Sequence, residues 1–94
     1  MLYKCTEWET TMGWHCNCTD NLAGGSSLWF LPARILNISP AALIDLMATK
    51  YKADVTFVGT DDKFIILFTW KKQSDCRTWK NFINRKAREV NFQI

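Results

Sequence analysis

The chain has 94 residues and a formal net charge of +3, and 48% of its residues are hydrophobic, including five tryptophans. This length suits one domain with a small core, and the aromatic content excludes an intrinsically disordered chain. The charge argues against an acidic DNA mimic and falls short of the basic bias of a dedicated nucleic-acid-binding protein.

Two classes of protein are also disfavoured by the apolar segments. Residues 1–20 contain four charged side chains and no apolar stretch, so we expect no secretory signal peptide. The longest apolar run, residues 64–70, is interrupted by Thr69 and is too short to span a bilayer. We therefore expect a cytoplasmic protein with no membrane partner, in which thiols stay reduced.

The first 27 residues form a cysteine-bearing, loop-rich lobe of a single domain covering residues 1–94. Glycine, serine, threonine and asparagine are frequent here, and these residues favour turns. Short strands near 3–8 and 13–18 would form a knuckle-like hairpin, which would carry three of the four cysteines. The remaining residues, 28–94, are expected to form the α+β core.

The core begins with an expected extended segment at residues 28–38, in which Pro32 permits only an edge strand or a bend. Ser39-Pro40 then marks a helix start, because serine caps free N–H groups and proline has the φ of the first helical position. Three apolar residues follow at helical spacing: Leu43, Met47 and Tyr51. We expect a helix over about residues 40–52.

A β-hairpin is predicted next. Val55 and Phe57 belong to a short strand, residues 59–62 have the composition of a turn, and residues 64–70 form a β-rich run. This second strand has apolar residues on both faces. That pattern indicates either a central strand covered on two sides or a strand with one face kept for a partner.

The last helix is expected to start at Ser74 as its cap, with Asp75 at its positive end. Its apolar stripe has helical spacing: Cys76, Trp79, Ile83, Ala87 and Val90. Residues 91–94 fit a short extra strand. Together the elements predict an α+β fold with a small antiparallel sheet, two helices and the cysteine-bearing N-terminal lobe.

Four cysteines equal the ligand count of a structural zinc site: Cys5, Cys16, Cys18 and Cys76. Thiolates suit zinc, and His15 is a substitute fourth ligand. Cys76 would lie in the first turn of the last helix, where the helix dipole lowers the pKa of a thiol. Such a closed site would be structural, and it would fasten the N-terminal lobe to the last helix.

Two other interpretations of the cysteines stay open. They can form disulfides, such as Cys5–Cys16 or Cys5–Cys18, or remain small buried apolar residues. A thiol enzyme would have to use His15, the single histidine, but the chain contains no nucleophile motif. We therefore expect neither enzymatic activity nor a small-molecule substrate.

The polar face of the last helix is the candidate partner-binding surface. It contains six side chains that bind phosphates or acidic proteins: Arg77, Lys80, Asn81, Asn84, Arg85 and Arg88. Residues 74–94 carry five basic and two acidic side chains, so this segment is the most basic part of the chain. The alternatives are a solvated helix face, a protein partner or a nucleic acid.

The spacing Cys5, Cys16-Asn17-Cys18 and Cys76, in a short aromatic-rich chain without a catalytic motif, resembles small phage-encoded inhibitors of the zinc-containing anti-CRISPR type. This is a resemblance of type, without a residue-by-residue motif. It implies a viral protein that docks on a CRISPR effector nuclease in the host cytoplasm and blocks guide or target DNA binding. We thus expect a non-enzymatic protein that acts by protein–protein interaction, with a nucleic-acid-binding regulator as the alternative.

Overall fold

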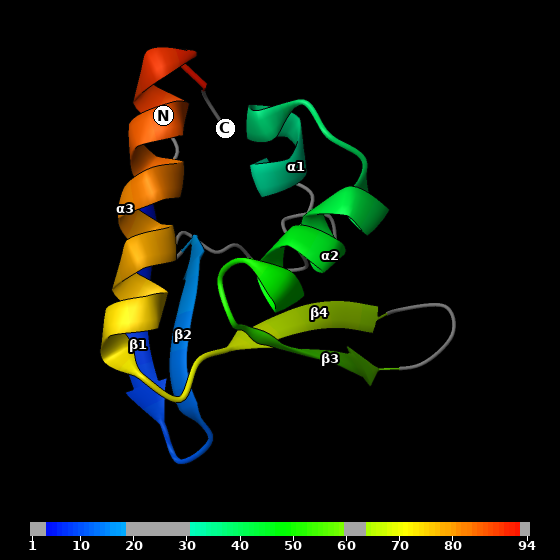
Figure 1. The fold of residues 1–94 in the computed structure, drawn as a ribbon, viewed down its shortest axis with the longest axis vertical. Coiled ribbons are helices and arrows are strands. Elements are labelled where there is room, and N and C mark those ends of the chain that lie inside the picture. Colours follow the sequence, from blue (N-terminus) through cyan, green and yellow to red (C-terminus); the bar gives the residue numbers. More distant parts are fainter. Residues whose placement is uncertain (1–3, 19–30, 60–63, 93–94) are drawn as a thin grey trace.

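The computed structural model describes residues 4–18, 31–59 and 64–92. Within them the order of elements is two strands, two helices, two strands and a long helix (Figure 1). Their bounds are β1 Cys5–Thr10, β2 Gly13–Cys18, α1 Leu31–Leu36, α2 Pro40–Thr49, β3 Asp54–Gly59, β4 Phe64–Thr69 and α3 Gln73–Glu89. The α+β class is therefore confirmed, with three helices in the described part of the chain where two were expected.

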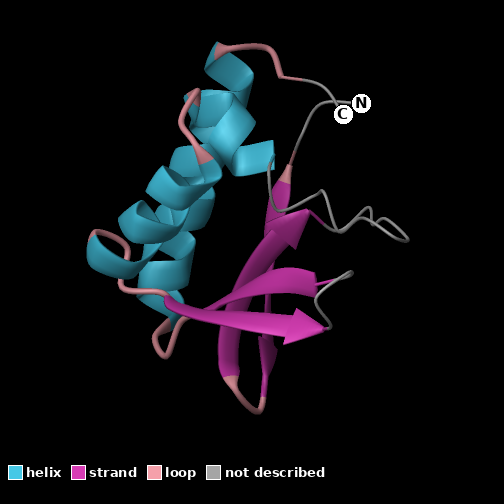
Figure 2. Cartoon of the chain, turned by 90° about the vertical axis from the view of Figure 1, so that its right-hand side faces the viewer, coloured by secondary structure: helices cyan, strands magenta, loops and turns pink. Residues whose placement is uncertain are grey.

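The strands form two antiparallel hairpins. β1 pairs with β2 and β3 with β4, and the helices gather on one side of the strands (Figure 2). The hairpins meet where Trp14 and Trp70 exchange backbone hydrogen bonds of 2.7 and 2.8 Å. The Trp70 side chain is fully buried, and its indole N–H donates to the Tyr51 carbonyl at 2.8 Å.

The hairpin of β1 and β2 is close to the expected one. β2 has the predicted bounds, whereas β1 runs from Cys5 to Thr10, two residues later than the prediction. β4 is not a central strand in the described structure, because it pairs along its length only with β3. The other interpretation of its apolar pattern, a face kept for a partner, stays a prediction.

Helix α2 starts as its sequence predicts. The Ser39 hydroxyl accepts the Ala42 N–H at 3.1 Å, and Pro40 occupies the first helical position. The helix ends at Thr49, three residues before the expected end, because Lys52 has a left-handed φ of 59° that turns the chain into β3. Leu43 and Met47 are fully buried.

Helix α1 corrects the prediction of an extended segment at residues 28–38, of which 28–30 lie outside the described residues. Leu31, Ala33 and Ile35 are buried at alternate positions, a spacing that resembles a strand. Pro32 is tolerated because it lies in the first turn. Asn37, with a φ of 57°, ends the helix, and Ile38 N–H donates to the Ala33 carbonyl at 3.0 Å.

Helix α3 carries most of the predicted apolar stripe. Cys76, Trp79, Ile83 and Ala87 are buried, but Val90 is 54% exposed because it lies past the last helical turn. The helix begins at Gln73, and Ser74 does not cap it. The Ser74 carbonyl instead accepts the Thr78 hydroxyl at 2.8 Å.

The chain after α3 is not a strand in its described part. Asn91 has a left-handed φ of 53°, and the Phe92 N–H donates to the Ala87 carbonyl at 2.9 Å. This is a helix-ending turn, so the predicted strand at 91–94 is wrong at its first two residues. Gln93 and Ile94 lie outside the described residues. None of the described helices combines the length and the apolar character needed to cross a bilayer.

Candidate functional site

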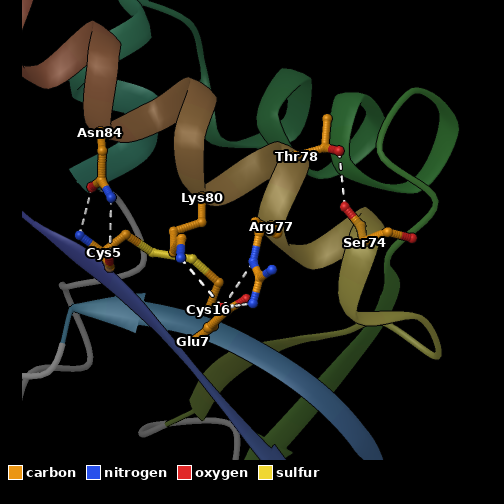
Figure 3. A network of polar contacts seen from close by, with 8 residues as sticks. All are labelled: Cys5, Glu7, Cys16, Ser74, Arg77, Thr78, Lys80 and Asn84. Carbon is orange, nitrogen blue, oxygen red and sulfur yellow. Dashed lines mark hydrogen bonds and ion pairs between the residues drawn. A yellow bond between two sulfur atoms is a disulfide. The ribbon is translucent and has the colours of Figure 1, made fainter.

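The structure brings two of the four cysteines together. Cys5 lies opposite Cys18 in the ladder, and Cys16 lies two residues further along β2, on the same face as Cys5. The Cys5 and Cys16 sulfur atoms form a disulfide, with the Cα atoms 6.1 Å apart (Figure 3). This is one of the two disulfides that the spacing left open. The side chain of Cys18 lies outside the described structure.

The Cys76 thiol does not have the lowered pKa that was predicted from its position in the first turn of α3. Its side chain is fully buried in the core, and burial raises the pKa of the thiol to about 11, with the Glu7 carboxylate adding to the shift. A thiol with this pKa is protonated at neutral pH, so Cys76 is a poor nucleophile.

Zinc at the four cysteines stays a prediction. In the described residues, no three or more His, Cys, Asp or Glu side chains cluster closely enough to hold a metal ion. Zinc needs free thiolates, so a disulfide between Cys5 and Cys16 and a zinc ion bound by them are mutually exclusive. The two states differ in mass and can be distinguished directly.

The predicted basic face of α3 is partly occupied by the chain itself. Arg77 donates two hydrogen bonds to Glu7 Oε1, at 3.1 Å from Nε and 2.8 Å from Nη2 (Figure 3). Lys80 Nζ lies 3.3 Å from the same oxygen. The Glu7 side chain is only 14% exposed, and the Arg77 hydrogen bonds lower the pKa of its carboxyl group.

Asn84 has a structural contact as well. Its Oδ1 accepts the Cys5 N–H at 2.7 Å, and its Nδ2 donates to the Cys5 carbonyl at 3.0 Å. The carboxamide thus makes the two bonds that a neighbouring strand would make with β1. It closes the outer edge of β1 beside the Cys5–Cys16 disulfide (Figure 3).

Three of the six predicted partner-binding residues are exposed and make no hydrogen bond or ion pair to β1. These are Asn81, Arg85 and Arg88. The Arg85 guanidinium lies 5.9 Å from the centre of the Phe82 ring, a cation–π distance. The described structure therefore leaves a smaller basic surface on α3 than the sequence pattern indicated.

The β1–β2 hairpin carries a shallow hollow on the face opposite to the Cys5–Cys16 disulfide. It was not predicted from the sequence. Its volume is about 260 Å³, and its lining consists of Trp8, Thr10, Thr11, Met12, His15 and Leu67. Trp8 is 39% exposed and Met12 60% exposed, and both are large apolar side chains. Of the three such exposed side chains in the described chain, two thus lie at this hollow. Among the described residues, its lining contains no Asp, Glu, Lys or Arg.

His15 organises the floor of the hollow. Its side chain is 3% exposed, with Nδ1 3.3 Å from the Phe68 carbonyl and Nε2 2.7 Å from Thr10 Oγ1. A carbonyl only accepts, so we assign the proton to Nδ1 and let Nε2 accept the Thr10 hydroxyl. The Trp8 ring stacks on the imidazole, with the ring centres 5.4 Å apart.

The turn next to the hollow is held by two features. Thr10 Oγ1 accepts the Met12 N–H at 3.2 Å, which fixes the two-residue turn between β1 and β2. Gly13 has a φ of 133°, and a Cβ atom there would lie 2.6 Å from the Trp70 carbonyl oxygen. Only glycine fits this contact, so the two hairpins approach closely and Leu67 reaches the hollow.

Sequence reasoning placed His15 in the lobe as a substitute zinc ligand and missed its role in the hollow. The available signal was a pair of apolar residues at the Thr11-Met12 turn, Trp8 before it and Met12 within it. The partner of His15 Nδ1, the Phe68 carbonyl, is 53 residues away and leaves no trace in local spacing.

Comparison of the chain with models of known protein families, with curated proteins and with solved structures found no match.

Proposed function

We propose that this protein is a non-enzymatic binding protein that recognises another protein through the hollow lined by Trp8, Met12 and Leu67. The observation that carries the proposal is the gathering of two exposed large apolar side chains at one uncharged depression. Exposed apolar groups that gather in one place mark interaction sites, whereas scattered ones need no explanation. Tryptophan is enriched among the residues that dominate binding energy, and methionine adapts its shape to a partner.

The size of the hollow favours a protein side chain over a free small molecule. Pockets for drug-sized ligands have volumes of roughly 300–1,000 Å³ and enclose most of the ligand. A shallow hollow of about 260 Å³ instead accommodates one apolar side chain from a partner surface. The absence of charged groups from its lining favours an aliphatic or aromatic side chain.

The floor of the hollow is already ordered before a partner binds. His15 is held by two hydrogen bonds, and the Trp8 ring rests on it. A side chain that is fixed in advance loses less conformational entropy on binding, which supports tighter association.

A displayed library of random peptides tests this function with no particular partner chosen in advance. Peptides are selected on the wild-type protein and then measured against Met12→Asp and Trp8→Ala. We expect selected peptides to share an apolar anchor residue and to lose at least tenfold in affinity for both variants. Met12 is mostly exposed, so its substitution leaves the fold intact.

Val90→Asp is the matched control, because Val90 is an exposed apolar residue remote in sequence from the hollow. Peptides should bind this variant as they bind the wild type. Equal affinity for the wild type, Met12→Asp and Trp8→Ala would refute the proposed site.

The more specific predictions depend on the amino-acid sequence alone. Docking on a CRISPR effector nuclease in the host cytoplasm rests on the resemblance of type, and no family match adds to it. Structural zinc rests on the count of cysteines. Inhibition of such a nuclease in a cleavage assay would support the first, and its loss in Met12→Asp would connect it to the hollow.

The nucleic-acid-binding alternative now relies on Arg85 and Arg88. Arg77 and Lys80 are engaged with Glu7, and Asn84 with Cys5, so these three side chains are already held by contacts within the chain. No described feature favours this alternative over protein binding.

A further inference from the structure

Three aromatic side chains meet where the chain that leaves α2 contacts α3. The Tyr51 ring lies edge-on to the Trp79 ring, with the ring centres 5.0 Å apart, and its centre is 5.8 Å from that of Phe82. The centres of the Trp79 and Phe82 rings are 5.9 Å apart. Tyr51 and Trp79 are buried, whereas Phe82 is half-buried. The aromatic cluster therefore reaches the surface at Phe82.

Three basic side chains surround this surface. Lys50 Nζ lies 5.7 Å from the centre of the Tyr51 ring. The Arg85 guanidinium carbon and Lys86 Nζ each lie 5.9 Å from the centre of the Phe82 ring. Burial raises the pKa of the Tyr51 hydroxyl, and the Arg85 charge opposes this rise, so Arg85 lies near both rings. We call these five residues the basic aromatic patch: Lys50, Tyr51, Phe82, Arg85 and Lys86.

Two of the three positive charges of the patch have no acidic partner in the described structure. Neither Lys50 nor Arg85 makes an ion pair with a described residue, and both are exposed. Lys86 is paired with Glu89, with 3.4 Å between Nζ and Oε2. The patch thus carries two positive charges, from two different elements, that the described part of the chain does not neutralise.

We propose that the basic aromatic patch is a docking site for an acidic segment of a partner protein, whose carboxylates bind Lys50 and Arg85. Charge complementarity argues for this occupant, because two exposed and unpaired cations attract a segment that carries two carboxylates. A guanidinium binds a carboxylate through two parallel hydrogen bonds, and the lysine ammonium binds one as a point charge. An apolar group of the same segment would cover the exposed part of the Phe82 ring.

This docking site is separate from the hollow. The patch belongs to the helical side of the molecule (Figure 2), whereas the hollow is lined by residues of the two hairpins. The two sites share no residue. The proposal therefore goes beyond the function proposed above and does not depend on it.

The geometry of the patch disfavours nucleic acid as the occupant. Single-stranded nucleic acid binds through bases stacked on open aromatic faces, along a groove of positive charges. Here the Phe82 ring is packed against Tyr51 and Trp79 and has two cations beside it. Two unpaired charges would neutralise only about two phosphates, which gives weak binding at physiological salt.

Fluorescence anisotropy with a labelled oligoglutamate peptide tests the site on the full chain. The peptide should bind the wild type at low salt and bind less as salt rises, because salt screens exposed charges. Lys50→Glu and Arg85→Glu should each lose roughly fivefold in affinity, because charge reversal replaces an attraction between exposed groups by a repulsion. An oligoglutamine peptide should not bind the wild type.

Lys71→Glu is the matched control, because it changes the net charge by the same amount. Lys71 is exposed and precedes the first residue of α3, which is roughly 18 Å along the helix axis from Arg85. This variant should bind the peptide almost as tightly as the wild type. Trp8→Ala, which alters the hollow, should bind it unchanged, so failure here is distinguishable from failure of the proposed function. Circular dichroism checks that each variant is folded.

Three results would overturn the proposal. The first is a wild type that does not bind oligoglutamate at low salt. The second is an equal loss of affinity in Lys71→Glu and Arg85→Glu, because net charge alone would then govern binding. The third is tighter binding of oligothymidine than of oligoglutamate, with the same dependence on Lys50 and Arg85, which would assign the patch to nucleic acid.

Discussion

Replacing Asn84 by alanine should loosen the attachment of α3 to the N-terminal hairpin. Asn84 makes two hydrogen bonds to the Cys5 backbone, at 2.7 and 3.0 Å, and connects segments 79 residues apart. Both bonds are partly buried, so water replaces them only in part. Each is worth about 1 kcal/mol net, so their removal costs about 2 kcal/mol.

Alanine also has a higher helix propensity than asparagine, which stabilises the variant by roughly 0.5 kcal/mol. Asn81→Ala is the matched control, because Asn81 is exposed on the same helix and its side chain makes no hydrogen bond within the described part of the chain. Both variants share the propensity gain, so their difference isolates the two bonds. In a domain of this size, about 2 kcal/mol corresponds to a Tm difference of roughly 8–16 °C.

Thermal unfolding followed by circular dichroism measures this difference. Asn84→Asp separates the two hydrogen bonds. It keeps an acceptor for the Cys5 N–H but loses the donor to the Cys5 carbonyl. The Cys5 amide should therefore exchange with solvent faster in Asn84→Ala than in Asn84→Asp. If Asn84→Ala and Asn81→Ala melt at the same temperature, the contact does not contribute to stability and the reasoning is wrong.

The remaining predictions concern acid stability and the cysteines. The pKa of Glu7 is lowered in the folded state, so its stabilisation is complete above the ordinary value of about 4.3 and is lost as pH falls toward the folded pKa. The Tm gap between wild type and Glu7→Gln should shrink below about pH 4.3; a gap independent of pH would contradict this. Cys16→Ser should cost about 3 kcal/mol if the disulfide, which closes a separation of 11 residues, is formed, and an unchanged free energy of unfolding in urea would argue against it. Native and denatured masses distinguish the two cysteine states: a disulfide lowers the denatured mass by two hydrogens, and a bound zinc ion adds its own mass only to the native protein.

Elements governed by local signals were predictable. The start of α2 depends on Ser39 and Pro40, which act on backbone groups within one turn. The stripe of α3 follows from helical spacing, and four of its five predicted residues are buried. The β1–β2 hairpin follows from turn residues next to short β-prone segments. In each case the deciding contacts lie within a few residues along the chain.

Helix α1 and the hollow were not predictable in the same way. The alternating burial of Leu31, Ala33 and Ile35 has the period of a strand, and the surrounding core decides that the segment is helical. The hollow depends on a hydrogen bond from His15 to the Phe68 carbonyl. That bond joins β2 to β4, next to the point where the two hairpins meet at Trp14 and Trp70.

The amino-acid sequence by itself determined the α+β class, the cap of α2, the apolar stripes of α2 and α3, and the presence of thiols and basic side chains. The tertiary structure decided how those side chains are used. Glu7, distant in sequence, brings Arg77 and Lys80 into contact with β1, and Asn84 is bound to Cys5. The reason is physical: periodicity and capping act over one or two helical turns, whereas ion pairs, disulfides and surface hollows require residues that only the folded chain brings together.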